Sequence, residues 1–218
     1  MKKILVYFLG VFCAINVMAQ NRGGDELDIQ AAVDAYIAMR DAVAANDCVA
    51  IKRSVEELKS VGTSDFSTLV CEDDAGGSLN GHFVFDEVFA DSIAEGKDVY
   101  HKADEMYRSA VQRGQTADGS ILTKTGVVKA GGSVRYSFAS KGHQELAVVA
   151  ESGGLLTMKI HVTNSAGYDK RFDDTKKVKR GMPHRKASFE LPTDKRNIVE
   201  LEVVNCGKRD CSFVIISN

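Results

Sequence analysis

The apolar residues change their spacing once along the chain, near residue 117. In segments such as 51–58 they recur every three or four positions, which is typical of a helix that buries one face. In later segments such as 158–162 they alternate with polar residues, which is typical of a strand with one face in a core. We therefore expect an α+β protein in two parts: a helical domain over residues 20–116 and an antiparallel, jelly-roll-like β-sandwich domain over residues 117–218.

Within the helical part, single residues mark where helices begin and end. Asp47 and Asp86 can accept hydrogen bonds from the first backbone N–H groups of a helix, and Gly62 can end one in the left-handed conformation. Two short apolar runs, 66–71 and 82–85, flank a polar stretch. This pattern predicts a small β-hairpin inserted between helices.

The first residues have the pattern of an export signal. Lys2 and Lys3 precede the apolar segment 4–17, and Ala19 is the small residue expected before a signal-peptidase cut. We predict a signal peptide over residues 1–19 and an exported protein, periplasmic or extracellular. No later apolar run is long enough to cross a membrane, so we expect no transmembrane segment in the mature form. An uncleaved membrane anchor is the alternative.

Removal of this leader, which contains Cys13, leaves four cysteines in an oxidising compartment, and an even number there predicts disulfides. Four cysteines allow three pairings, and proximity in the sequence favours Cys48–Cys71 and Cys206–Cys211. A zinc site is the alternative, but the cysteine spacings do not fit one and no histidine is suitably placed.

The second of these disulfides would join the last two strands. If Cys206 and Cys211 face each other across a tight turn, Val203 lies opposite Val214 on the apolar face. We therefore predict that these two strands form a hairpin in one sheet.

The two parts carry opposite net charge. Residues 20–116 contain 9 Lys and Arg against 19 Asp and Glu, a balance of −10, whereas residues 117–218 contain 17 against 11, a balance of +6. Such asymmetry indicates two different surfaces. Much of the basic excess lies between residues 169 and 186. The candidate binding residues there are Lys170, Arg171, Lys176, Lys177, Lys179, Arg180, Arg185 and Lys186.

Clustered cations on a strand connection predict an anionic partner: an acidic polysaccharide, a lipid head group or another envelope protein. We expect no nucleic acid, because export removes the usual partner and Phe172 is the one aromatic ring in the stretch that could stack on a base. The alternative is a solvated loop, or one that docks on the acidic helices of the same molecule.

Four stretches of the second part resemble the bacterial pre-peptidase C-terminal domain. They are Ser133–Phe138, Leu146–Ala150, Met158–Val162 and Val199–Ile216. The sequence departs from that family in lacking its Gly-Asp-Ala-Asp-Leu-type segment and in its long basic insertion. The resemblance implies a non-catalytic β-sandwich module of a secreted bacterial protein, often implicated in binding or solubility. The helical part resembles no family that we recognise.

The chain has none of the sequence motifs of serine hydrolases, zinc peptidases, P-loop enzymes or dinucleotide-binding enzymes. We therefore expect no catalytic residue, no metal and no cofactor, and we predict an exported, non-catalytic envelope protein for binding or adhesion. The alternative is a small secreted hydrolase in which His82 is the general base and the loop Glu72–Asp74 supplies its carboxylate, because a carboxylate fixes the tautomer of a catalytic imidazole.

Overall fold

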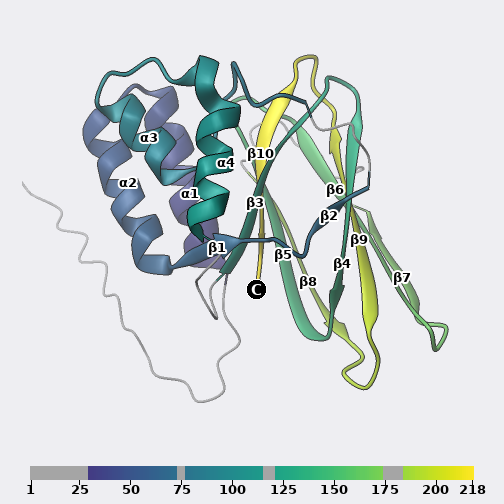
Figure 1. Cartoon of the computed structure of the whole chain (residues 1–218). Helices are drawn as coiled ribbons and strands as arrows, with labels where there is room; N and C mark the ends of the chain where they lie inside the picture. The colour runs from purple at the N-terminus through teal and green to yellow at the C-terminus, as the bar shows by residue number, and fades with distance from the viewer. Residues whose placement is uncertain (1–28, 73–76, 115–120, 174–183) are drawn as a thin grey trace, which may run out of the picture.

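A computed structural model of the chain describes residues 29–72, 77–114, 121–173 and 184–218, and these form three layers (Figure 1). Helices make the first layer, a five-stranded sheet packs against them, and a second five-stranded sheet lies on the far side. We call the two sheets the helix-facing sheet and the outer sheet. The predicted signal peptide, residues 1–19, lies outside the described residues.

The helical layer is built around α1 and α2, which form an antiparallel pair. Asp47 accepts hydrogen bonds from the backbone N–H groups of Val49 and Ala50, and Gly62 ends α2 with a φ of 72°, so both predicted ends are confirmed. Asp86 caps α3 by accepting from Phe89 N. No helix among the described residues is long and apolar enough to span a membrane. The helices are α1 (Gln30–Ala44), α2 (Cys48–Val61), α3 (Glu87–Ala94) and α4 (Ala103–Gly114), with a 3-10 turn over Tyr100–Lys102.

The strands follow a jelly-roll order from β3 onward, so the predicted α+β fold with a β-sandwich is confirmed. From β3 onward, consecutive strands cross between the sheets except β6 and β7, which are neighbours in the outer sheet. All strand pairs are antiparallel except β1 with β3. The helix-facing sheet contains, in order, β1 (Thr63–Asp65), β3 (Ile121–Val128), β10 (Cys211–Ser217), β5 (Gly142–Ala150) and β8 (His184–Leu191). The outer sheet contains β2 (Val70–Cys71), β4 (Ser133–Ser140), β9 (Asn197–Asn205), β6 (Leu156–Asn164) and β7 (Asp169–Asp173).

Two apolar cores hold the layers together. The first lies between the helices and the helix-facing sheet and includes Met39, Phe89 and Val214. The second fills the sandwich and includes Leu201 and Phe213. Neighbouring residues of β10 therefore enter different cores, and every residue of that strand is buried. A strand covered on both sides loses the alternation that an exposed face imposes.

The small hairpin expected between residues 62 and 85 is not formed. β1 instead pairs in parallel with β3, and β2 pairs with β4. The segment after α2 therefore extends the edges of both sheets in turn, while residues 82–85 form no strand. The two apolar runs are real, but they bury their side chains against existing layers and not against each other.

The predicted terminal hairpin is wrong, because β9 and β10 lie in different sheets. Val203 pairs with Val134 and Met158, whereas Val214 pairs with Thr125 and Val149. The connection between the strands crosses the sandwich and does not turn back in one sheet. This crossing is part of the jelly-roll order, in which β10 lies between β3 and β5 of one sheet and β9 lies between β4 and β6 of the other.

The four cysteines in the described ranges form no disulfide, so neither predicted pairing is present in the structure. Cys48 begins α2 in the helical layer, whereas Cys71 lies in β2 at the edge of the outer sheet (Figure 1). Cys206 follows β9 and its Sγ lies 3.9 Å from Thr157 Oγ1. Cys211 is buried at the start of β10, where burial raises the pKa of its thiol to about 12.

Candidate functional site

The outer sheet carries a groove on its solvent face. Its volume is about 580 Å³, and it crosses β4, β9, β6 and β7. Alternate residues of these strands fill the sandwich core, so the others point to solvent, and several of them are charged. We call this feature the outer-sheet groove. It is lined by Glu72, Arg135, Lys159, Ile160, His161, Arg171, Phe172, Glu200, Leu201 and Glu202.

At one end of the outer-sheet groove, the Glu202 carboxylate is contacted by three polar side chains. Lys159 Nζ donates a hydrogen bond of 2.8 Å to its Oε2, and Ser133 Oγ donates one of 2.9 Å to Oε1. Arg135 Nε lies 3.6 Å from the same Oε1. These contacts, the Lys159 hydrogen bond first, lower the pKa of the Glu202 carboxyl. Cross-strand pairs of opposite charge stabilise neighbouring strands of a sheet in this way.

Replacing Glu202 by Gln is expected to lower the free energy of unfolding by about 1.5–3 kcal/mol at pH 7, the usual range for a hydrogen bond to a charged group. The folded-state pKa of Glu202 is depressed, so its stabilisation is present above the unfolded pKa and is lost as the pH falls through the lower folded value. Urea unfolding at pH 7 and about pH 2.5 measures this, with the gap between the two proteins closing at low pH. Glu57→Gln, in an exposed pair with Arg53, is the control and should change stability by less than about 0.5 kcal/mol. An equal loss at both pH values contradicts the assignment.

His161 organises the other end of the groove. Its Nδ1 lies 3.0 Å from Glu200 Oε2 and its Nε2 lies 3.1 Å from Asp169 Oδ1. Both ring nitrogens can donate at once only in the protonated imidazole. Arg171 follows on β7, with its side chain 75% exposed and its Nε 3.9 Å from Asp169. Cations and carboxylates therefore alternate along the groove.

The four described residues of the predicted basic cluster lie on two strands of different sheets, β7 and β8. Arg171 lines the groove, and the neighbouring Lys170 is exposed with its ammonium 5.2 Å from the ring centre of Tyr168. Arg185 is only 7% exposed, because it points from β8 toward the sandwich interior, where Val148 lies opposite. The remaining four residues, Lys176, Lys177, Lys179 and Arg180, lie outside the described residues.

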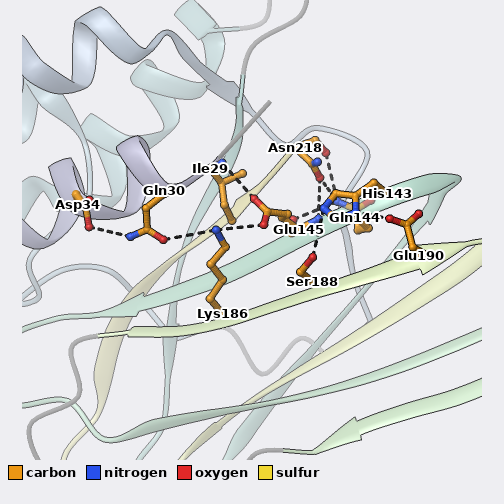
Figure 2. Close-up of polar contacts among 10 residues, drawn as sticks. All are labelled: Ile29, Gln30, Asp34, His143, Gln144, Glu145, Lys186, Ser188, Glu190 and Asn218. Carbon is orange, nitrogen blue, oxygen red and sulfur yellow. Dashed lines mark hydrogen bonds and ion pairs between the residues drawn. The ribbon is translucent and has the colours of Figure 1, made fainter. Parts of the chain in front are cut away.

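Lys186 serves to hold the helices to the sheet (Figure 2). Its Nζ lies 3.2 Å from Glu145 Oε1 and 3.5 Å from Gln30 Oε1, while Glu145 Oε2 accepts a hydrogen bond of 3.4 Å from Ile29 N. This contact joins β8 and β5 to the start of α1. Lys186 and Arg185 are therefore engaged inside the molecule and are not available at the groove.

Beside this contact, Figure 2 shows a serine, a histidine and a glutamate in line. His143 Nδ1 lies 2.7 Å from Glu190, and Nε2 lies 3.2 Å from Ser188 Oγ. Acid, base and hydroxyl have the order found in hydrolases. However, Ser188 lies within β8, opposite Glu145, and regular strand geometry does not direct paired N–H groups at a serine side chain, as an oxyanion hole requires. The contact therefore ties two strands together.

His82 does have a carboxylate within reach, but it is not the predicted one. Its Nδ1 lies 3.5 Å from Glu151 Oε1, and Glu151 accepts hydrogen bonds from the backbone N–H and hydroxyl of Ser212. Asp73 and Asp74 lie outside the described residues, and Glu72 lines the outer-sheet groove. His82 thus links the segment before α3 to the helix-facing sheet. No group of three or more His, Cys, Asp or Glu in the described ranges could hold a metal ion.

Comparison of the sequence with protein-family models and with curated proteins finds no match. Solved structures share the β-sandwich architecture over about half of the chain. The Yersinia pseudotuberculosis-derived mitogen is 12% identical, with a TM-score of 0.35, over 45% of this chain and 85% of its own. The module TmCBM61, solved with β-1,4-galactotriose, is 8% identical, with a TM-score of 0.30, over 45% and 81%.

The periplasmic inhibitor of g-type lysozyme from Salmonella Typhimurium is 15% identical, with a TM-score of 0.30, over 48% of this chain and 92% of its own. Similarity at this level is no argument for a shared ligand. The resemblance to the pre-peptidase C-terminal domain is thus supported at the level of a β-sandwich, while no family model matches the chain.

Most residues of the groove are not predicted from the sequence. Arg135, Lys159, Glu200 and Glu202 are separated by up to 67 positions in the chain and meet only because β4, β9 and β6 are neighbours. These residues are the polar members of segments in which apolar and polar residues alternate, so the sequence does indicate that they face solvent. Pairing of the strands, which the alternation does not specify, decides which of these charges face each other.

Proposed function

We propose that the protein is an exported, non-catalytic binding module that holds an anionic glycan in the outer-sheet groove, with the cations of residues 174–183 adding to its attraction for the ligand. One observation carries the proposal: Arg171 lines the groove together with Arg135 and Lys159, and the basic segment begins directly after the strand that carries Arg171. The leader pattern of residues 1–19 supports export.

The groove itself has little net charge, so the attraction for an anionic ligand must come largely from residues 174–183. Arg135, Lys159 and Arg171 face three glutamates in the lining, so the groove by itself is close to neutral apart from His161. Residues 174–183 add four cations against one carboxylate, a balance of +3. An anionic ligand would thus contact ordered hydrogen-bonding groups in the groove and gain net attraction from the segment.

The shape and composition favour a glycan over a lipid surface. An open groove across several strands accommodates an extended chain, and its carboxylates, imidazole and guanidinium groups can bond hydroxyls as well as anions. The large apolar side chains that are exposed in the described ranges, Val49, Val70, Val88 and Ile198, are separate and not aromatic. A sugar ring therefore has no stacking platform among them. Phe172, the aromatic residue in the groove lining, is partly buried in the second core, so we expect recognition to come mainly from charge and hydrogen bonds.

The test is retention of residues 20–218 on dextran sulfate and polygalacturonate, with neutral dextran and anionic lipid vesicles as comparisons. Changing Lys176, Lys177, Lys179 and Arg180 to Ala is expected to weaken polyanion binding about tenfold at low salt, since four charges at about 0.4 kcal/mol each give that factor. Binding should also fall as salt rises, and less steeply for the variant.

A matched control removes four exposed lysines elsewhere, Lys52, Lys97, Lys195 and Lys208, and should retain binding. Arg171→Ala, which removes a groove residue without touching the segment, should weaken binding further in the quadruple variant. The proposal fails if neither polyanion binds at low salt, if the control loses as much affinity as the variant, or if vesicles alone bind.

A further inference from the structure

A second cavity lies on the opposite side of the sandwich, between the helices and the helix-facing sheet. Its volume is about 250 Å³, enough for a small organic molecule. The proposed glycan site makes no use of it. We call it the helix–sheet pocket. It is lined by Tyr36, Thr63, Ser64, Asp65, Phe85, Asp86, Glu87, Val88, Tyr107, Ala110, Val111, Thr123 and Thr125.

The pocket exists because β1 is short. β1 pairs with β3 only as far as Asp65 with Thr123. Beyond that point a side chain completes the edge of β3: the backbone N–H of Thr125 donates a hydrogen bond of 3.0 Å to Tyr107 Oη from α4. The pocket lies between this sheet edge and the helices, and polar groups from both line it.

Three carboxylates line the pocket, and none of the lining residues is basic. The side chain of Asp65 is only 7% exposed and has Lys124 Nζ at 3.5 Å. Asp86 caps α3, and Glu87 follows it. Burial, followed by repulsion from Asp86 and Asp91, raises the pKa of the Glu87 carboxyl, although Lys59 opposes this. A cation inside the pocket would relieve that repulsion.

The other walls are aromatic and hydroxylic. Tyr36 is buried, packs edge-on against Phe85 at 6.0 Å, and is hydrogen-bonded to the side chains of Thr123 and Thr63. Burial raises the pKa of Tyr36 to about 12 and also raises that of Tyr107, so both hydroxyls stay neutral. Because Tyr107 Oη accepts from Thr125, its own proton can be donated to another group.

We infer that the helix–sheet pocket binds a small organic cation with a primary ammonium group, held by the carboxylates of Glu87 and Asp65 against the aromatic wall. The carboxylates supply acceptors for the three N–H bonds of an ammonium group, and aromatic rings attract a cation that has lost part of its hydration. Charge thus distinguishes this pocket from the outer-sheet groove, which we assign to an anion.

The experiment is calorimetric titration of residues 20–218 with 1,4-diaminobutane and with 1,4-butanediol, which has the same length and no charge. We expect the diamine to bind and the diol not to bind. Glu87→Gln should weaken diamine binding at least about tenfold, the loss of one ion pair of roughly 1.4 kcal/mol. Asp65→Asn gives an independent variant from the floor of the pocket, with the same expected direction.

Glu95→Gln is the matched control, because Glu95 directly follows α3 but is exposed, is paired with Lys97 and does not line the pocket. It should bind the diamine as the unmodified protein does. Near-ultraviolet circular dichroism of each variant establishes that the fold is retained. The inference is overturned if the diamine does not bind at about 10 mM, because a dissociation constant above that value corresponds to a binding free energy of less than about 3 kcal/mol. It is also overturned if the diol binds as well as the diamine, or if both pocket variants bind the diamine as the unmodified protein does.

Discussion

Residues 117–218 produced without the helices are expected to aggregate, or to unfold without a cooperative transition. The face of the helix-facing sheet that contacts the helices is apolar, and in the whole chain it is almost completely buried. Its residues include Val127, Ala147, Val149, Val214 and Ile216, each at most 1% exposed. Removing the helical layer would expose a contiguous apolar patch of the kind that soluble monomers avoid.

The same truncation also removes an edge strand from each sheet. β1 covers the edge of β3, and β2 covers the edge of β4. Unpaired edges are templates for strand addition between molecules, so they add to the tendency to aggregate. Light scattering, binding of a hydrophobic dye and urea unfolding measure these effects, with residues 20–218 as the reference protein.

Two further measurements separate loss of the interface from a general weakness of the sandwich. Adding residues 20–116 in trans should restore solubility, because the two parts share a core. Ile216→Asp in the whole chain should destabilise by several kcal/mol, since a buried charge has no partner there, whereas Ile198→Asp on the outer sheet should have little effect. A soluble fragment 117–218 with a cooperative transition contradicts this prediction and favours the two independent domains proposed from the sequence.

The sequence contains a second feature, beyond alternation, that predicts to which of the two sheets a strand belongs. β5 and β10 contain uninterrupted apolar runs, and both lie in the sheet that is covered on two sides. β9 alternates between buried and more exposed residues, Glu200 and Glu202 among the latter, and lies in the sheet that faces solvent. The difference between a continuous and an alternating strand therefore separates the sheets, and it argues against a β9–β10 hairpin.

Other features had no local signal. Cys206 and Cys211 are close in sequence whether the connection turns within one sheet or crosses the sandwich, so spacing alone could not exclude the disulfide. The helix–sheet pocket depends on where β1 stops, and three residues carry too little periodicity to predict that. Caps such as Asp47 and Asp86 were predictable because they act on backbone N–H groups two or three positions away.

Replacing Gly126 by Ala is expected to lower the free energy of unfolding by about 2–3 kcal/mol, as overpacking of a filled core does. Gly126 lies on β3 and faces the sandwich interior, opposite Phe213 of β10. An added Cβ would lie 2.7 Å from Tyr136 Oη and 2.9 Å from a ring carbon of Phe213. Both rings are buried in the second core, so neither can move without displacing its neighbours.

The cause can be isolated because Gly126 has no positive φ. In a conformation that alanine adopts freely, Gly→Ala by itself reduces the entropy of the unfolded chain and stabilises by about 0.4–1 kcal/mol, so any net loss reports the clash. Removing the hydroxyl in Tyr136→Phe relieves the shorter contact and leaves the one with Phe213. The double variant should therefore recover about 1 kcal/mol relative to the sum of the single variants in urea unfolding. If the changes in unfolding free energy of the two single variants simply add, the Tyr136 hydroxyl does not limit the size of residue 126. The close approach of β3 to the outer sheet would then have another cause.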